Sequence, residues 1–226
     1  MLSISTTHEW RISHPGAVIG LLELSGMDNA QPFSKLDERK RETEAILRER
    51  YRGFARQDFL SLPVMAAYQS YYKRFVKTYH VLLQLESIVL KGKNLPNVSP
   101  LVDANFAAEV DTLILTAGHD AEKLQAPICM DVSRAGDQIV RMNGEPKSMD
   151  AGDMVMRDAN GVCCSIIYGQ DNVSPISSGT THALYVAYAP AGVPMDAVDA
   201  QLRKIEENIR LFCPTAHVEQ RQLLSA

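Results

Sequence analysis

The sequence lacks several features that identify common classes of protein. It has no uninterrupted apolar run near the roughly 18 residues that a membrane span needs, and Met1 to Arg11 contains no basic start followed by an apolar segment. It has no C-x-x-C pair, and its four cysteines lie in apolar surroundings, which indicates reduced, buried thiols rather than zinc ligands. We therefore expect a cytoplasmic protein that holds no metal and no other cofactor.

Common catalytic motifs are also missing. The chain has no G-x-S-x-G, no H-E-x-x-H and no G-x-x-x-x-G-K-[ST], which disfavours the better-known hydrolases, metalloproteases and mononucleotide sites. Its 226 residues, 46% of them hydrophobic and 22% charged, suffice for one folded domain with a sizeable core. Any chemistry must therefore come from residues that the fold brings together.

The charge of the chain gives no general attraction to nucleic acid. Lys and Arg together number 23 against 27 Asp and Glu, a formal net charge of −4. Contact with RNA would need a local basic surface. The candidate cations are Lys73, Arg74, Lys77, Lys91 and Lys93. Aromatic residues interleaved with them could stack unpaired bases, or the cations could form a solvated face beside a helix core.

The order of the expected elements predicts the class of fold. We expect a buried strand at 17–24, helices at 34–55, 62–75, 80–90 and 102–116, strands at 128–132, 138–142, 154–157, 162–168 and 183–189, an amphipathic helix at 195–212, and a loose polar tail at 213–226. Helices that precede strands favour a single α+β domain over residues 1–226, with helices packed on antiparallel or mixed sheets.

The expected helix at 34–55 is rich in Glu, Arg and Lys. Ser34 and Asp37 have the spacing of a capping box, and Leu36, Ile46 and Leu47 supply a thin apolar stripe. The pattern predicts an exposed helix, and an exposed polar helix could serve a protein partner.

Four polar residues fall on the expected helix at 102–116: Asp103, Asn105, Glu109 and Asp111. Paired carboxylates could perform acid–base chemistry. The favoured interpretation is a solvated helix face, with Asp103 near the N-terminus complementing the helix dipole.

His119 and Asp120 follow Ala117-Gly118 where this helix is expected to end. A histidine on a loop that faces a cleft could shuttle protons, and a surface residue or helix cap is the alternative.

The segment around Ser177, Ser178 and Thr180 is rich in hydroxyl groups. Its backbone amides could receive an anion or a ribose, although it lacks the spacing of a phosphate-binding loop. A simple turn is the alternative.

Two segments resemble a known family. Residues 90–103 read LKGKNLPNVSPLVD and residues 118–124 read GHDAEKL. This pattern resembles the B3/B4 domain found in the beta subunit of bacterial phenylalanyl-tRNA synthetase, and the likeness extends in order over about 16–190. It implies a layered α+β fold with a pocket that, in the synthetase, hydrolyses tyrosine wrongly esterified to the tRNA.

The resemblance also implies an altered site. The family's editing helix carries Thr-Asn three and four residues after the Val, and a His shortly before the Asp. An alignment without gaps from Val102 to Asp120 places Asn105 and Phe106 at the first two positions and Ala117 at the His. Phe106 and Ala117 thus replace an amide and an imidazole.

Roles for the remaining residues follow from the resemblance. Asn105 and His119 would position the ester and a water, Asp120 would orient His119, and the substrate would lie against the following residues: Asp103, Phe106, Ala117, Ser177, Ser178 and Thr180.

Three functions remain open from the sequence. The first is a freestanding protein that binds tRNA or aminoacyl-tRNA and, if it is an enzyme, deacylates mischarged tRNA without being a complete tRNA ligase. The second is a non-enzymatic pocket for an amino acid or a similar small molecule. The third is a protein-interaction module.

Overall fold

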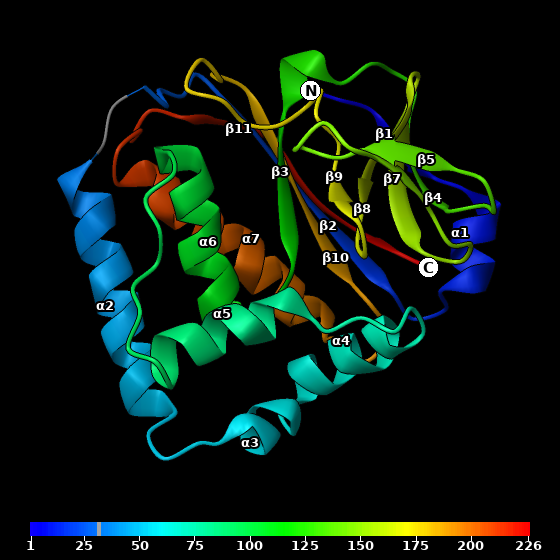
Figure 1. Ribbon diagram of the computed structural model, residues 1–226. Helices are drawn as coiled ribbons and strands as arrows, with labels where there is room; N and C mark the ends of the chain where they lie inside the picture. Colours follow the sequence, from blue (N-terminus) through cyan, green and yellow to red (C-terminus); the bar gives the residue numbers. More distant parts are fainter. Residues whose placement is uncertain (31–32) are drawn as a thin grey trace.

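An apolar strand near the start of the sequence lies inside a four-stranded sheet. In the computed structural model, which describes residues 1–30 and 33–226, β2 (Val18–Ser25) pairs with β10 (Ala183–Ala189) on one side and β11 (His217–Ser225) on the other. β3 (Thr116–Asp120) pairs with the other side of β10, so the antiparallel order is β11-β2-β10-β3 (Figure 1). Segments from the beginning, middle and end of the chain therefore meet in one sheet.

A second sheet has five strands in the order β1-β4-β7-β8-β9. β1 is parallel to β4, and the other neighbours are antiparallel. Its strands are β1 (Ile4–Thr6), β4 (Ile128–Val132), β7 (Met154–Asp158), β8 (Gly161–Ser165) and β9 (Gly169–Gln170). A separate hairpin joins β5 (Gln138–Val140) to β6 (Pro146–Ser148).

Two helices, α6 (Pro100–Thr112) and α7 (Met195–Arg210), cover the four-stranded sheet (Figure 1). The close approach of α7 to the sheet depends on Gly20 of β2, because a Cβ atom there would lie 2.7 Å from Val198 Cγ1 of α7. The remaining helices are α1 (His8–Ser13), α2 (Ser34–Arg50), α3 (Arg56–Leu60), α4 (Pro63–Lys73) and α5 (His80–Val89).

Three tyrosines of α4 connect the two larger sheets. The Tyr68 hydroxyl donates to the main-chain oxygen of Tyr188 in β10 over 2.7 Å. Tyr71 donates to Asp153 Oδ1 over 2.6 Å, and Tyr72 donates to the main-chain oxygen of Ile166 over 2.7 Å, both beside the five-stranded sheet. All three rings are buried, so they belong to the core and do not offer faces for base stacking.

The helix expected at 102–116 ends earlier than predicted. α6 stops at Thr112, Leu113 adopts a left-handed conformation with φ of +66°, and the chain reverses into β3. The expectation of a loop at His119 and Asp120 is therefore wrong, because both residues belong to this strand. Helical spacing misled the prediction, since Leu113, Ile114 and Leu115 are buried beyond the helix end and not along it.

The expected loose tail is also wrong. Residues 217–225 form β11, and Gln220 Nε2 donates to Glu23 Oε2 over 2.6 Å and to the main-chain oxygen of Leu2 over 2.8 Å. Its polar sequence suits an edge strand, which has one side against β2 and one side exposed. The sequence interpretation also missed β1 and α1, whose N-cap Thr7 accepts a hydrogen bond from the Trp10 amide over 3.1 Å.

The polar helix α2 differs from its expected form. Phe33 is the N-cap residue and makes no side-chain cap, so the Ser34–Asp37 capping box is not formed. The helix ends at Arg50, and its inner face buries Lys40 and Glu44. The helix is therefore a structural element with a buried polar face.

The described residues form a single α+β domain in which seven α-helices pack on mixed and antiparallel sheets, as the sequence predicted. Along these residues no helix combines the length and apolar character needed to cross a membrane.

Candidate functional site

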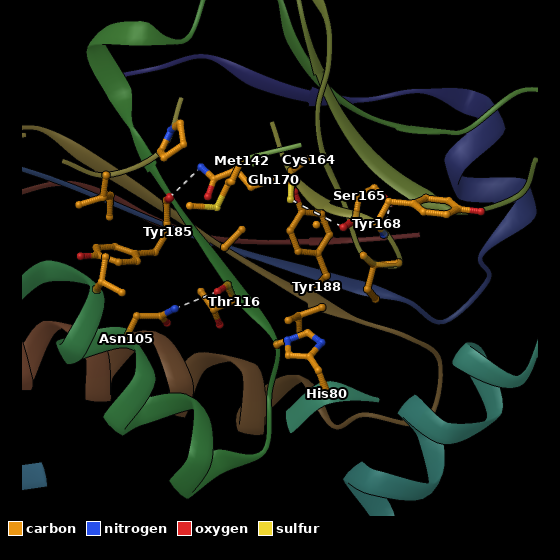
Figure 2. Close-up of a pocket in the computed structure, with 18 of the residues that line it drawn as sticks. His80, Asn105, Thr116, Met142, Cys164, Ser165, Tyr168, Gln170, Tyr185 and Tyr188 are labelled. Atoms are coloured by element: carbon orange, nitrogen blue, oxygen red, sulfur yellow. Dashed lines mark hydrogen bonds between the residues drawn. The ribbon is translucent and has the colours of Figure 1, made fainter. Parts of the chain in front are cut away.

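The described residues enclose a cavity of about 400 Å³ between α6, β3 and the end of the five-stranded sheet (Figure 2). We call it the site cavity. It is lined by His80, Val102, Asn105, Phe106, Leu115, Thr116, Ala117, Gly118, Met142, Cys164, Ser165, Ile166, Ile167, Tyr168, Gly169, Gln170, Pro175, Ile176, Tyr185 and Tyr188. The volume suits an amino-acid-sized group or a small ligand.

Asn105 is fixed by the turn that joins α6 to β3. Its Nδ2 donates to the main-chain oxygen of Thr116 over 2.8 Å, and the Thr116 amide donates to Glu109 Oε2 over 2.9 Å. Asn105 and Glu109 are both buried, so the expected solvated face of this helix is wrong. Burial raises the pKa of Glu109 to about 8, which leaves its carboxyl protonated at neutral pH. The amide of Asn105 thus shapes the wall of the cavity.

Phe106 and Ala117 both lie on the wall of the site cavity. They are the two positions at which the resemblance implied a lost amide and a lost imidazole. Each is partly buried and packs against the hydrophobic core. The cavity therefore offers apolar contact at these two positions.

His119 lies behind the wall and does not line the site cavity. Its ring is fully buried, and Nδ1 lies 2.8 Å from Ser174 Oγ, which donates to Asp171 Oδ1 over 2.7 Å. Because the Ser174 proton goes to Asp171, we assign the Nδ1 proton of His119 to Ser174. Nε2 is then a bare acceptor, and it has no partner among the described residues. Burial lowers the pKa of His119 to about 3, so the ring is neutral at physiological pH.

Gln170 lies between this buried histidine and the cavity. Its Nε2 lies 2.9 Å from the main-chain oxygen of Gly118, 2.9 Å from His119 Nδ1 and 3.2 Å from the main-chain oxygen of Ser174. The two amide protons satisfy the two carbonyl oxygens, which is consistent with the assigned tautomer of His119. The main-chain oxygens of Gly118 and Ser174 thus hold the side chain of Gln170 against the wall.

The wall of the site cavity has little charge. The described residues that line it include no Asp, Glu, Lys or Arg. Burial raises the pKa of Cys164 to about 12, so its thiol stays protonated. His80 contributes an imidazole to the wall of the cavity (Figure 2), and desolvation lowers its pKa below the usual value. A ligand in this cavity meets apolar surface and neutral hydrogen-bonding groups.

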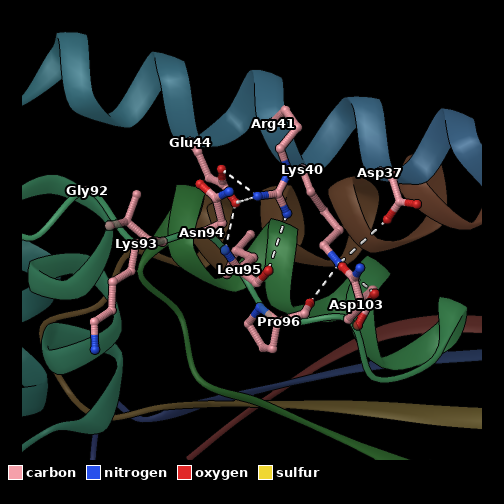
Figure 3. Close-up of polar contacts among 12 residues, drawn as sticks. Asp37, Lys40, Arg41, Glu44, Gly92, Lys93, Asn94, Leu95, Pro96 and Asp103 are labelled. Atoms are coloured by element: carbon pink, nitrogen blue, oxygen red, sulfur yellow. Dashed lines mark hydrogen bonds and ion pairs between the residues drawn. The ribbon is translucent and has the colours of Figure 1, made fainter.

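Asp103 belongs to a different set of contacts (Figure 3). Its Oδ2 accepts a hydrogen bond from Lys40 Nζ over 2.6 Å, and its Oδ1 accepts one from the Val98 amide over 2.9 Å. Lys40 Nζ also donates to the main-chain oxygen of Pro96 and to Asn97 Oδ1. Asp103 therefore joins α2 and the 94–98 loop to α6, and it does not line the site cavity.

The hydroxyl-rich turn lies apart from the site cavity as well. Thr180 is buried, and its hydroxyl donates to Asp120 Oδ2 over 2.8 Å while accepting the Ser177 amide over 2.9 Å. Asp120 also caps the short helix that follows β3 by accepting the Glu122 amide. Ser178 lines a separate cavity of about 210 Å³ together with Asp103. These residues do not converge with Asn105 on one cleft.

The candidate cations form two groups. Lys73, Arg74 and Lys77 lie at the end of α4, where Arg74 Nη2 donates to the main-chain oxygen of Gly152 over 3.1 Å. Lys91 and Lys93 follow α5, so the length of that helix separates them from Lys77. All five side chains are exposed. Among the described residues, no three or more His, Cys, Asp and Glu side chains gather where a metal ion could bind.

Several lining residues carried no clear signal in the sequence. Gln170 is an isolated amide in the sequence and has no diagnostic spacing. His80 is the first residue of α5, and Tyr188 is near the end of β10, a strand that reads simply as apolar. No local pattern joins these positions, because their proximity depends on how the two sheets pack.

Comparison with known proteins identifies the family of this chain. The family model described as the B3/4 domain matches residues 67–211. A similar solved structure is an N-terminal fragment of the phenylalanyl-tRNA synthetase beta subunit from Pyrococcus horikoshii, with 6% sequence identity and a TM-score of 0.46. The match covers 100% of this chain and 57% of that one. No curated protein gave a match. Because the family model spans more than half of its residues, the chain belongs to the B3/4 domain family.

Proposed function

We propose that this protein binds the aminoacyl end of a charged tRNA and that the site cavity takes the amino-acid group. The main support is that Asn105, Phe106 and Ala117 all line one cavity of about 400 Å³. The resemblance assigns these positions to the Thr-Asn pair of the editing helix and to the His shortly before the Asp. Phe106 and Ala117 add apolar surface there, which favours an apolar or aromatic amino-acid side chain.

The neutral wall favours an ester over a free amino acid. A free amino acid would bring a carboxylate into a cavity whose described wall has no Lys or Arg to pair with it. Burying an unpaired charge is costly, and esterification removes the carboxylate charge. The proposed ligand is therefore an aminoacyl ester, with its ammonium group toward the mouth of the cavity.

The proposed roles of the other predicted residues follow from their positions. Asn105 keeps the wall in place, and His119 acts through the Ser174 hydroxyl as a positioning residue behind the wall. Asp103, Asp120, Ser177, Ser178 and Thr180 lie outside the site cavity and support the surrounding loops. The exposed Lys91 and Lys93 would contact tRNA phosphates, with Lys73, Arg74 and Lys77 as a second basic surface.

Hydrolysis of the ester would need a base at the cavity. His80 is the one lining residue, within the described part of the chain, whose side chain can accept a proton near neutral pH. A second candidate function is binding without hydrolysis, and the lack of further acid–base groups on the wall favours it. The ligand would then be the same aminoacyl ester or a neutral analogue of it.

Binding can be tested separately from hydrolysis. We expect a non-hydrolysable, amide-linked analogue of tyrosyl-adenosine to raise the melting temperature and to give a measurable Kd. Ala117→Phe should fill the cavity and abolish this binding. Ala135→Phe, at an exposed turn before β5, is the matched control and should bind normally.

Deacylation is measured with tyrosine-mischarged phenylalanine tRNA and with other mischarged tRNAs. Binding together with release faster than in buffer supports a trans-acting esterase, and binding with release at the buffer rate supports a binding protein. Absence of binding to every aminoacyl ester would rule out the proposed function.

A further inference from the structure

A second cavity adjoins the site cavity. It has a volume of about 370 Å³ and lies between α5 and the 94–96 loop. His80 and Phe106 line both cavities, so the two cavities meet at these residues. We call the second one the side cavity. Together the two chambers have room for a ligand larger than an amino acid.

The side cavity has flat apolar surfaces and a few polar groups. Phe106 presents an aromatic ring, and Leu83 and Ile88 add aliphatic surface. Gln84 lines the same chamber, and its Oε1 is buried without a hydrogen-bond partner among the described residues. A buried amide oxygen without a donor is costly, which points to a ligand that supplies an N–H group at this place.

We propose that the side cavity binds the adenine ring of the nucleoside to which the acyl group is esterified. The ring packs against Phe106, as unpaired bases do on aromatic side chains, and its exocyclic amino group donates to Gln84 Oε1. This inference rests on the proposed function, because it joins a base in the side cavity to an acyl group in the site cavity. The ester bond then lies where the two cavities meet, beside His80.

The exposed cations lie near the side cavity, which is the end of the ligand where the tRNA chain would continue. Asn94 lines the chamber and follows Lys91 and Lys93, whose side chains are exposed. A polynucleotide that leaves the side cavity along this loop places its phosphates beside two cations. The site cavity, at the other end of the ligand, has no charged lining residue among those described.

Binding of three ligands can be compared to test the two cavities separately. Tyrosine methyl ester reaches the site cavity alone, whereas the amide-linked analogue of tyrosyl-adenosine reaches both. The same analogue with inosine in place of adenosine presents a carbonyl oxygen to Gln84 where adenine presents an amino group. We expect the adenosine analogue to bind about tenfold or more tightly than the methyl ester, because one stacked and hydrogen-bonded base contributes that much. The inosine analogue should lose most of this gain.

A variant pair tests the same contact from the protein side. Gln84→Leu should weaken binding of the adenosine analogue about fivefold to tenfold and leave the methyl ester unaffected. Gln57→Leu makes the same exchange at an exposed position of α3 and should change neither Kd.

The outcomes distinguish this inference from the proposed function. If the methyl ester binds and the adenosine analogue binds no better, the side cavity is not a nucleoside site, while the proposed function stands. Equal binding of the adenosine and inosine analogues also overturns the contact with Gln84, and it does so in the unmodified protein. If no ester binds at all, the proposed function fails and the inference fails with it.

Discussion

Lys40 of α2 lies 2.6 Å from Asp103 of α6, and their side chains are 0% and 7% exposed. Removing one member of a buried ion pair leaves the other charge without compensation. We expect Lys40→Met to lower the free energy of unfolding by about 3–5 kcal/mol, measured by urea denaturation. Adding Asp103→Asn to this variant should recover part of the loss, because it removes the unpaired charge.

An exposed ion pair on the same helix provides the control for this prediction. Arg39 and Glu42 are 39% and 67% exposed, so Arg39→Met should cost less than about 1 kcal/mol. Equal costs for Lys40→Met and Arg39→Met would show that the buried pair does not hold α2 against α6.

Val76 occupies a position that favours glycine. Its φ is +53°, its amide donates to the Lys73 carbonyl, and the Lys77 amide donates to the Tyr72 carbonyl, the pattern of a helix end that usually has Gly. The side chain is 93% exposed, so its removal costs no packing. We expect Val76→Gly to stabilise the protein by about 1 kcal/mol and to raise the melting temperature by about 2–4 °C.

Leu113 has a similar backbone conformation but a buried side chain, with φ of +66° and 5% exposure. Leu113→Gly should therefore destabilise the protein by about 2–4 kcal/mol, since the lost packing exceeds the relief of strain. A change of the same sign in both variants would contradict this account of the two helix ends.

Glu109 should make stability fall as the pH rises. An unfolded Glu ionises near pH 4.5, whereas burial raises the pKa of the folded Glu109 to about 8. Between these values the unfolded chain has lost the proton that the folded protein keeps, so higher pH favours unfolding by about 1.4 kcal/mol per unit. Below pH 4.5 both states hold the proton, and the effect vanishes.

Glu109→Gln removes this titration and can still accept the Thr116 amide. We expect the variant to gain stability relative to the parent protein between pH 5 and pH 8, by about 2–4 kcal/mol in thermal or urea unfolding. Burial also raises the pKa of Asp153 to about 6. Asp153 titrates in both proteins, so its contribution cancels in the difference between them. Glu42→Gln, at an exposed position, is the control. If the free energy of unfolding of Glu109→Gln changes with pH in parallel with that of the parent protein, the prediction is refuted.

His80 should control any ester hydrolysis at the site cavity. If His80 is the base on the cavity wall, His80→Gln removes that base. The variant should therefore release tyrosine from mischarged tRNA about 100-fold more slowly. Because burial lowers the pKa of His80, the rate should rise with pH in the acid range and be level above neutrality. His8→Gln, at an exposed position of α1, should leave both the rate and the pH profile unchanged.

The sequence predicted much of the fold because most elements carry their own periodicity. The apolar run at 183–189 matches β10 at both ends, and the amphipathic pattern from 195 matches α7. The prediction from the sequence failed where tertiary contacts override the local pattern. Leu113 takes a left-handed conformation without a glycine, and β11 is polar because one of its sides is an exposed edge.

The site was predictable in part for a related reason. Asn105, Phe106 and Ala117 lie in one stretch of α6 and β3, so a family pattern could find them. His119 was misplaced because its burial depends on Ser174 and Gln170, which are distant in sequence. The burial of Lys40 was missed for the same reason. A lysine in a charged helix is expected to be exposed unless its partner on α6 is known.

The pairing of β11 with β2 constrains the order in which the protein folds during synthesis. Ser25 and Glu219 form a hydrogen bond across 194 positions of the chain, and β10, the other neighbour of β2, is also synthesised late. The helices between residues 34 and 112 can form from nearby residues, but the sheet must wait for sequence-distant partners, which is slow. The nascent chain therefore carries β2 as an unpaired apolar strand until residues 183–225 have been made. Tyr185 and Tyr188 of β10 complete the wall of the site cavity, so this wall forms only at the last stage of assembly.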